Sequence, residues 1–305
     1  MKSAHHKIPG IVKVVFLISV FAIISTSFTE AQAKNTPPNI IFIISDQMRA
    51  DAIGAAGNSN AQTPHIDILA SSGVMLRNNF SNNPVCLPSR ISMFSGLYPS
   101  QTGVLCNKHQ GPWLSFKGSL PWYLKNAGYR TGYVGKNHTF EQSEMVNFDV
   151  VSLRGREEFR AYSKYVPPFW HSDILLPEED CNPGKNTEDD FDFIDQSSPE
   201  HPFFIHISYL DPHPPYMVCE PYAGMYSKDQ TPLPAWTAEE MQNKPYRQKL
   251  IVEWDRYGKE YPGDAIRELR TRYWGMVSYI DTELGKLMNV LEETGQADNT
   301  IIVFT

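Results

Sequence analysis

Four short apolar runs, each of a length suited to a β-strand, set the fold that this 305-residue chain can adopt. They are residues 39–45 (NIIFIIS), 129–134, 203–210 (FFIHISYL) and 300–305 (TIIVFT). Such continuous apolar runs are typical of strands that are covered on both faces. Helical patterns separate the runs, and the longest is an apolar stripe over residues 265–293. Strands and helices therefore alternate, which predicts an α/β fold with a mostly parallel central sheet.

Polar residues directly follow each of the first three runs. They are Asp46 and Gln47, then Lys136 and His138, then His213. The carboxyl ends of parallel strands are where open α/β sheets bind ligands. A helix or turn cap would account for Asp46 alone, and an isolated lysine–histidine pair is usually solvated surface. Their shared position after buried strands instead indicates a site at one edge of the sheet.

A thiol, a hydroxyl and a guanidinium lie within five residues at Cys86, Ser89 and Arg90. Pro88 suits the first turn of a helix, and apolar residues then recur at helical spacing as far as Leu97. We therefore expect a helix that begins at Pro88, with Cys86 just ahead of it. The N–H groups at a helix N-terminus attract anions, and Arg90 adds a planar cation. The motif indicates a nucleophile that faces a phosphate-like or sulfate-like group.

These motifs resemble those of the type I sulfatases, in the alkaline phosphatase-like superfamily. The matching segments are residues 86–90 (CLPSR), 95–99 (SGLYP), 45–51 (SDQMRAD) and 135–138 (GKNH). The resemblance spans essentially all of residues 38–305. It implies an alkaline phosphatase-like α/β/α sandwich, with residues 34–305 forming the N-terminal part of the catalytic domain.

The resemblance implies hydrolysis of a sulfate monoester by a formylglycine nucleophile. A maturation enzyme converts the motif cysteine, here Cys86, to formylglycine, and the hydrated aldehyde supplies the attacking oxygen. Lys136 would bind the sulfate and His138 would serve the formylglycine oxygen. His213 would contact the sulfate and assist the leaving group, while Arg90 would hold developing charge. A sulfated small molecule or a sulfated carbohydrate is the implied substrate.

The resemblance also implies a divalent metal ion, Ca²⁺ with Mg²⁺ as the alternative, on Asp46, Gln47 and the residue derived from Cys86. Many sulfatases have a second aspartate where this chain has Gln47, although an amide oxygen can still serve a hard cation. Related phosphonate monoester hydrolases carry glutamine at this position as well. Two alternatives stay open. One is a phosphonate or phosphate ester hydrolase of the same superfamily, which shares the metal, the fold and the formylglycine. The other is a non-catalytic protein that binds sulfated glycans, because the sequence lacks half of the family's metal ligands.

The N-terminal 33 residues have the pattern of a secretory signal peptide. Lysines begin the segment, an uncharged apolar run covers residues 14–24, and Ala-Gln-Ala at 31–33 is a cleavage pattern. We expect cleavage near Ala33 and an exported protein, periplasmic or extracellular. The net charge of −7 argues against nucleic-acid binding, and it means that an anionic substrate must meet a local cationic pocket.

The cysteines predict little covalent cross-linking. If Cys86 is modified, the remaining cysteines are Cys106, Cys181 and Cys219. At most one disulfide can then form, and one thiol stays free. The sequence leaves the pairing open.

Three segments carry weaker expectations. Residues 141–200 are polar and uneven, which predicts an insertion or a long surface loop with its acidic cluster at 188–190 in solvent. Pro212 and Pro214 flank His213 and predict an extended backbone there. The last run, residues 300–305, is expected to be a buried strand.

The final expectation concerns the end of the chain. In sulfatases the strand that matches residues 300–305 is followed by Ser-Asp-His-Gly or Ser-Asp-Asn-Gly, a turn that carries the second pair of metal ligands. A further lysine and a smaller C-terminal subdomain come next. None of these follows Thr305 in the sequence. The resemblance therefore implies a catalytic domain truncated before its C-terminal subdomain, and residues 34–305 alone are expected to be inactive and poorly folded.

Overall fold

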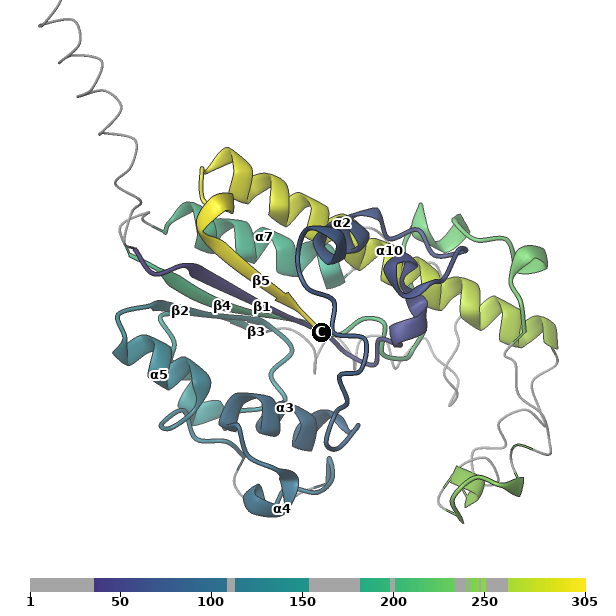
Figure 1. Cartoon of the computed structure of the whole chain (residues 1–305), viewed down its shortest axis with the longest axis horizontal. Helices are drawn as coiled ribbons and strands as arrows, with labels where there is room; N and C mark the ends of the chain where they lie inside the picture. Colours follow the sequence, from purple (N-terminus) through teal and green to yellow (C-terminus); the bar gives the residue numbers. More distant parts are fainter. Residues whose placement is uncertain are drawn as a thin grey trace, which may run out of the picture. The chain divides into compact units, whose positions relative to one another are not determined.

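A five-stranded parallel sheet lies at the centre of the computed structural model (Figure 1). Its strands are β1 (Asn39–Ser45), β2 (Arg130–Gly135), β3 (Val150–Leu153), β4 (Phe203–Tyr209) and β5 (Thr300–Phe304). Their order across the sheet is β3-β2-β4-β1-β5, and every pair of neighbours runs parallel. The predicted parallel α/β fold is confirmed.

The structure describes residues 36–108, 113–153, 182–197, 201–233, 240, 242–246, 248–250 and 263–305. The residues from Pro38 to Thr305 belong to one structural unit. The predicted signal peptide and Cys181 lie outside the described residues. Among the described helices, none combines the length and the apolar character that crossing a membrane requires.

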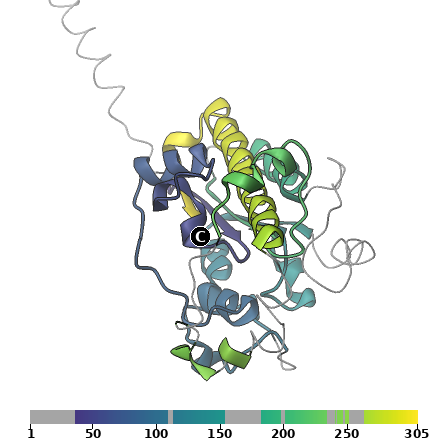
Figure 2. The same cartoon turned by 90° about the vertical axis from the view of Figure 1, so that its right-hand side faces the viewer.

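Helices cover both faces of the sheet, as Figures 1 and 2 show from two directions. On one face lie α2 (Pro64–Ser72), α7 (Asn182–Asp195) and α10 (Gly263–Glu293). On the other lie α3 (Cys86–Ser95), α4 (Pro99–Thr102) and α5 (Leu120–Asn126). Short 3₁₀ helices are η1 (Ala50–Ala52), η2 (Gly54–Ala56), η3 (Gln142–Asn147), η5 (Tyr222–Gly224), η6 (Lys228–Gln230) and η7 (Ala297–Asn299). This is the expected α/β/α sandwich.

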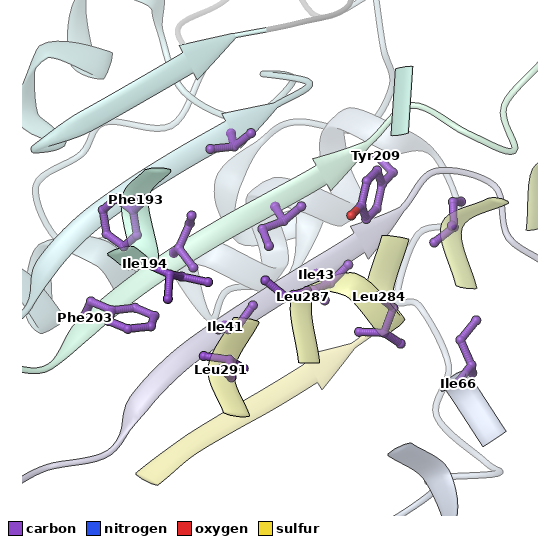
Figure 3. Packing of buried hydrophobic residues seen from close by; sticks show 14 residues of the cluster. Ile41, Ile43, Ile66, Phe193, Ile194, Phe203, Tyr209, Leu284, Leu287 and Leu291 are labelled. Atoms are coloured by element: carbon purple, nitrogen blue, oxygen red, sulfur yellow. The ribbon is translucent and has the colours of Figure 1, made fainter. Parts of the chain in front are cut away.

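Alternation along the strands divides the core into two layers. Successive side chains of a strand point to opposite faces. Ile41 and Ile43 of β1 therefore pack beneath α7 and α10, against residues such as Phe193, Leu284 and Leu287 (Figure 3). All five side chains are almost completely buried, and each such burial contributes about 1.5–3 kcal/mol to the stability of the fold.

The opposite layer contains a buried histidine among aromatic rings. His206 of β4 is fully buried, with ring centroids 4.9 Å from Phe94 and 4.7 Å from Tyr133. Its Nδ1 lies 2.9 Å from the carbonyl oxygen of Phe42, so Nδ1 carries the proton of the neutral ring. Burial, with a smaller contribution from the nearby Arg90 charge, lowers the pKa of His206 to about 3.

The expectation of a surface loop across residues 141–200 is wrong for its described parts. This region supplies η3, the sheet strand β3 and the helix α7. Phe193 and Ile194 of α7 belong to the core, and Asp190, which was expected in solvent, is fully buried. The buried face of α7 also carries polar residues, so the sequence shows no clear apolar stripe at helical spacing.

Three smaller expectations also need correction. Helix α3 begins at Cys86 rather than Pro88, so Cys86 occupies its first turn. The backbone at His213 forms a turn, in which its N–H donates to the carbonyl of Leu210 at 3.0 Å. Strand β5 lies at the edge of the described sheet and pairs with β1, which leaves Ile301 and Val303 exposed by 49% and 42%.

The buried His206 predicts a loss of stability in mild acid. The folded state keeps this ring neutral down to about pH 3, whereas the unfolded chain protonates it near 6.5. Its contribution is thus complete above pH 6.5 and is lost as the pH falls, by about 2 kcal/mol between pH 7 and pH 5. His206→Phe should lose about 2 kcal/mol less than the parent in urea unfolding at these two pH values. Equal losses would contradict the assignment.

Candidate active site

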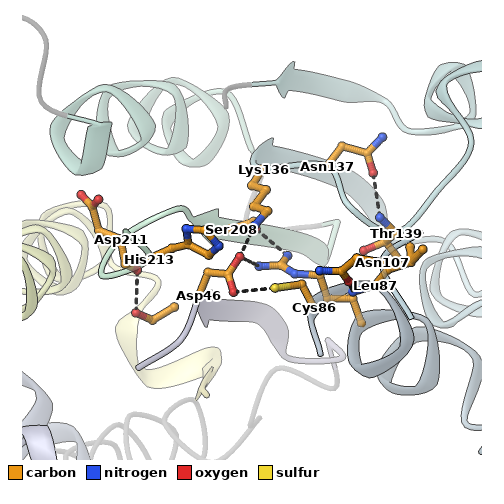
Figure 4. A network of polar contacts seen from close by, with 12 residues as sticks. Asp46, Cys86, Leu87, Asn107, Lys136, Asn137, Thr139, Ser208, Asp211 and His213 are labelled. Atoms are coloured by element: carbon orange, nitrogen blue, oxygen red, sulfur yellow. Dashed lines mark hydrogen bonds and ion pairs between the residues drawn. The ribbon is translucent and has the colours of Figure 1, made fainter. Parts of the chain in front are cut away.

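Three neighbouring strands and one helix bring five of the predicted residues together. The ends of β1, β4 and β2 deliver Asp46, His213 and Lys136 to one edge of the sheet (Figure 4). Helix α3 adds Cys86 from its first turn and Arg90 from its second, and because these residues lie four positions apart they share one face of the helix. The predicted clustering at the carboxyl ends of the strands is present.

The carboxylate of Asp46 lies at the centre of this cluster and is 5% exposed. Its Oδ1 accepts a hydrogen bond from the Cys86 thiol at 3.3 Å. Its Oδ2 contacts the ammonium of Lys136 and lies 3.6 Å from Nη2 of Arg90. Burial acts to raise the pKa of Asp46, but the charges of Lys136 and Arg90 outweigh it and leave the pKa lowered. Asp46 is therefore ionised at neutral pH.

The guanidinium of Arg90 is anchored through Nη1, and its Nη2 group is available to donate hydrogen bonds. Arg90 is 2% exposed, and its Nη1 donates to the hydroxyl of Ser208 at 2.7 Å. Ser208 alternates with the core residues of β4, so its hydroxyl points toward α3. The buried Nη2 has no hydrogen-bond partner among the described residues. Because buried donors are normally satisfied, Nη2 suits an anion in the site.

The Cys86 thiol is half-buried and is not part of a disulfide. Burial, followed by the charge of Asp46, raises its pKa, so the unmodified residue is a protonated thiol at neutral pH. The next N–H of the helix, that of Leu87, donates to Asn107 Oδ1 at 2.9 Å. The sequence did not identify Asn107, because this cap comes from a loop twenty residues away.

His213 is half-buried and neutral. Its Nδ1 lies 2.6 Å from the carbonyl oxygen of Pro214, so Nδ1 carries the proton and Nε2 carries the lone pair. Burial and then the charge of Lys136 lower its pKa. The potential ligand atoms of Asp46, Cys86 and His213 all lie within 4.8 Å of one another.

The surroundings of two further predicted residues are described only in part. The ring of His138 packs near that of Trp113, with centroids 5.3 Å apart. Gln47 is exposed, with a backbone φ of 64°. The described hydrogen bond of Gln47 is through its carbonyl oxygen, which accepts from the Tyr273 hydroxyl at 2.9 Å. The roles of His138 and Gln47 stay predictions.

The cysteines agree with the expectation of few cross-links. Cys106 is a free, exposed thiol in the segment that also carries Asn107. Cys219 is buried and disulfide-bonded. Cys106 is therefore an accessible thiol against which the reactivity of Cys86 can be compared.

The cluster has the chemistry for part of a divalent-cation site. It offers a carboxylate oxygen, a sulfur and an imidazole nitrogen within a small volume. Asp46 supplies one negative charge, while Arg90 and Lys136 together supply two positive charges. A cation would therefore need further negative charge close by, from an anionic ligand or from additional acidic residues.

Removing the central charge should activate the Cys86 thiol. Asp46→Asn abolishes the negative charge beside Sγ and leaves Arg90 and Lys136 in place, so the pKa of Cys86 should fall. Labelling of unmodified protein with limiting iodoacetamide should then show faster modification of Cys86 relative to Cys106, because the thiolate is the reactive form. Asp51→Asn, an exposed neighbour, serves as the control. An unchanged ratio in Asp46→Asn would contradict the proposed contact.

Comparison with known proteins places the chain among the sulfatases. A family model described as Sulfatase matches residues 38–305. The arylsulfatase of Clostridium perfringens is 25% identical and human iduronate 2-sulfatase is 26% identical, with 88% and 97% of this chain covered. The chain spans only 62% and 59% of those two relatives.

Solved structures show the same fold. A phosphonate monoester hydrolase from Agrobacterium radiobacter superposes with a TM-score of 0.72 at 22% identity, over 88% of this chain and 62% of that structure. Structural likeness at this identity supports the alkaline phosphatase-like fold. The match to the family model covers most of the chain and includes every residue of the cluster. The chain belongs to the Sulfatase family.

Proposed function

We propose that the protein hydrolyses sulfate monoesters. The observation that carries this proposal is the cationic pocket beside residue 86, where Nη2 of the buried Arg90 has no hydrogen-bond partner among the described residues. The ammonium of Lys136 forms an ion pair with the same Asp46 carboxylate and adds a second positive charge to the pocket. The cluster therefore carries an excess of positive charge, although the chain as a whole is acidic. A tetrahedral oxyanion is the ligand that this charge and geometry favour.

The nucleophile in this proposal is formylglycine made from Cys86 by a maturation enzyme. Once formed, its hydrated aldehyde would supply an attacking oxygen that, unlike a thiolate, leaves no stable thiol–sulfate adduct. The unmodified Cys86 is a weak nucleophile here, because burial and the Asp46 charge raise its thiol pKa. This supports a modified residue at position 86 rather than direct catalysis by the thiol.

The side chains around residue 86 would bind the sulfate and move protons. Arg90 and Lys136 are preorganised to hold charge on the sulfate oxygens, and Asp46 keeps both in place. The lowered pKa of His213 makes it neutral, so Nε2 must first take up a proton before it can give one to the leaving oxygen. We assign His138 the remaining proton transfer from the modified residue 86, as its family motif suggests.

A divalent cation completes the proposed site. Asp46, Gln47 and residue 86 would hold it, and we propose Ca²⁺, with Mg²⁺ as the alternative. Such a cation acts as a Lewis acid and stabilises negative charge on the sulfate. Because Arg90 and Lys136 already offset the charge of Asp46, we expect the site to bind the cation more tightly when an oxyanion is present.

We propose the substrate class from the name of a relative, and the location from the predicted signal peptide. The name of human iduronate 2-sulfatase refers to a sulfated sugar, which supports a sulfated carbohydrate as substrate, with a smaller sulfate ester as the alternative. The predicted signal peptide supports an exported protein. Sulfated polysaccharides outside the cytoplasm would then be accessible to it.

The test uses the protein expressed from its complete reading frame together with a maturation enzyme. Mass spectrometry of the tryptic peptide 78–90 should show that Cys86 has lost sulfur and gained a carbonyl oxygen. The matured protein should hydrolyse 4-nitrophenyl sulfate, and Arg90→Ala or Lys136→Ala should lower turnover by about 10²–10³-fold, because each removes a preorganised donor. Lys125→Ala, which removes an exposed ion pair with Asp149, should leave turnover unchanged.

The same assay separates the alternatives. Faster hydrolysis of a phenylphosphonate monoester than of the sulfate ester would favour the phosphonate hydrolase. Binding of sulfated oligosaccharide without turnover, by protein with an unmodified Cys86, would favour the glycan-binding protein. Either result would contradict the proposed sulfatase activity.

A further inference from the structure

The turn that carries Asp46 has a backbone conformation that needs support. Gln47, the next residue, has φ of 64°, in the left-handed region that residues other than glycine seldom adopt. Its side chain is exposed, so burial of that side chain does not hold the turn. The N–H of Asp46 donates to the carbonyl of Tyr209 at 3.3 Å, which ties the inner side of the turn to the sheet. The rest of the turn, from Gln47 to Arg49, is held by a different contact.

The hydroxyl of Tyr273, on α10, supplies that contact. It donates to the carbonyl oxygen of Gln47 at 2.9 Å and accepts the N–H of Arg49 at 2.8 Å. The hydroxyl oxygen of Tyr273 therefore bridges the turn, with one hydrogen bond to Gln47 and one to Arg49. Burial raises the pKa of Tyr273, so the hydroxyl keeps the proton that it donates across the neutral range.

The ring of Tyr273 also reaches the segment that carries His213. It packs edge-on against the ring of Tyr216, with centroids 5.8 Å apart. Tyr216 lies three residues after His213, beyond the turn that follows β4. One side chain of α10 thus contacts both loops that bring Asp46 and His213 to the cluster.

We propose that Tyr273 is a positioning residue that sets where the Asp46 carboxylate lies relative to residue 86 and His213. It acts through the two loops, since its described contacts are with their backbone and with Tyr216. The catalytic meaning of this role rests on the proposed function. Without the Tyr273 hydroxyl, the turn at Gln47 loses its hydrogen bonds to α10, and Asp46 can move away from the Cys86 thiol.

Tyr226 offers a matched control. Its hydroxyl accepts the N–H of Gln62 at 2.9 Å and lies 2.6 Å from the hydroxyl of Ser278, so it also joins α10 to a loop through two hydrogen bonds. That loop precedes α2 and carries none of the cluster residues. Tyr226→Phe and Tyr273→Phe therefore each remove one hydroxyl that makes two hydrogen bonds between α10 and its surroundings, and each keeps its ring.

The experiment compares the two variants by labelling unmodified full-length protein with limiting iodoacetamide. Mass spectrometry gives the ratio of Cys86 to Cys106 labelling, with the free and exposed Cys106 as internal reference. Burial, and after it the Asp46 charge, raises the pKa of Cys86, so a displaced carboxylate should speed its labelling. Tyr273→Phe should raise the ratio about threefold or more, because the thiolate is the reactive form and a displaced Asp46 carboxylate no longer disfavours it. Tyr226→Phe should leave the ratio unchanged.

Hydrogen–deuterium exchange gives a second readout. Peptides covering residues 46–52 and 211–216 should exchange faster in Tyr273→Phe than in Tyr226→Phe. Should Tyr273→Phe fail to fold, Tyr216→Leu keeps both hydroxyl bonds but removes the ring contact, and it should raise exchange over 211–216.

An unchanged labelling ratio in folded Tyr273→Phe, or an equal rise in Tyr226→Phe, would overturn the proposal, as would unchanged exchange over 211–216 in Tyr216→Leu. Neither readout needs a metal ion, formylglycine or a sulfate ester. A failed sulfatase assay would therefore leave the positioning role of Tyr273 standing, and a failed labelling test would leave the proposed sulfatase activity untouched.

Discussion

The site depends on one buried carboxylate that serves three neighbours. Asp46 accepts from the Cys86 thiol and forms ion pairs with Lys136 and Arg90. An unpaired guanidinium as deeply buried as that of Arg90 would be costly, because burial removes its hydration. Asp46 offsets that cost only in part, since one negative charge faces two positive ones. The remaining positive charge is what makes this edge of the sheet attractive to an oxyanion.

The sheet explains why these groups meet although they are far apart in sequence. Asp46, Lys136 and His213 each follow a strand, and their strands are adjacent in the order β2-β4-β1. Alternation along β4 turns Ser208 toward α3, where it receives Nη1 of Arg90. Parallel pairing therefore builds the site, and the loops that follow the strands set its details.

Much of this arrangement could be predicted from sequence, and the failures have physical causes. Strand-length apolar runs revealed β1, β2 and β4, and spacing after them pointed to Asp46, Lys136 and His213. Helix α7 was missed because its buried face includes polar residues such as Asp190. The supporting roles of Ser208 and Asn107 could not be predicted from the sequence, because each residue contacts a partner that is distant in sequence. Strand β3 was hidden in the same polar region as α7.

The central claim is that Arg90 and Lys136 form an oxyanion site against Asp46. A crystal structure of the protein soaked in tungstate, a tetrahedral oxyanion with strong anomalous scattering, tests it directly. We expect an anomalous peak within hydrogen-bond distance of Nη2 of Arg90 and of the Lys136 ammonium, and its loss in Arg90→Ala. Tungstate bound only elsewhere, with Nη2 of Arg90 hydrogen-bonded inside the protein, would contradict the account.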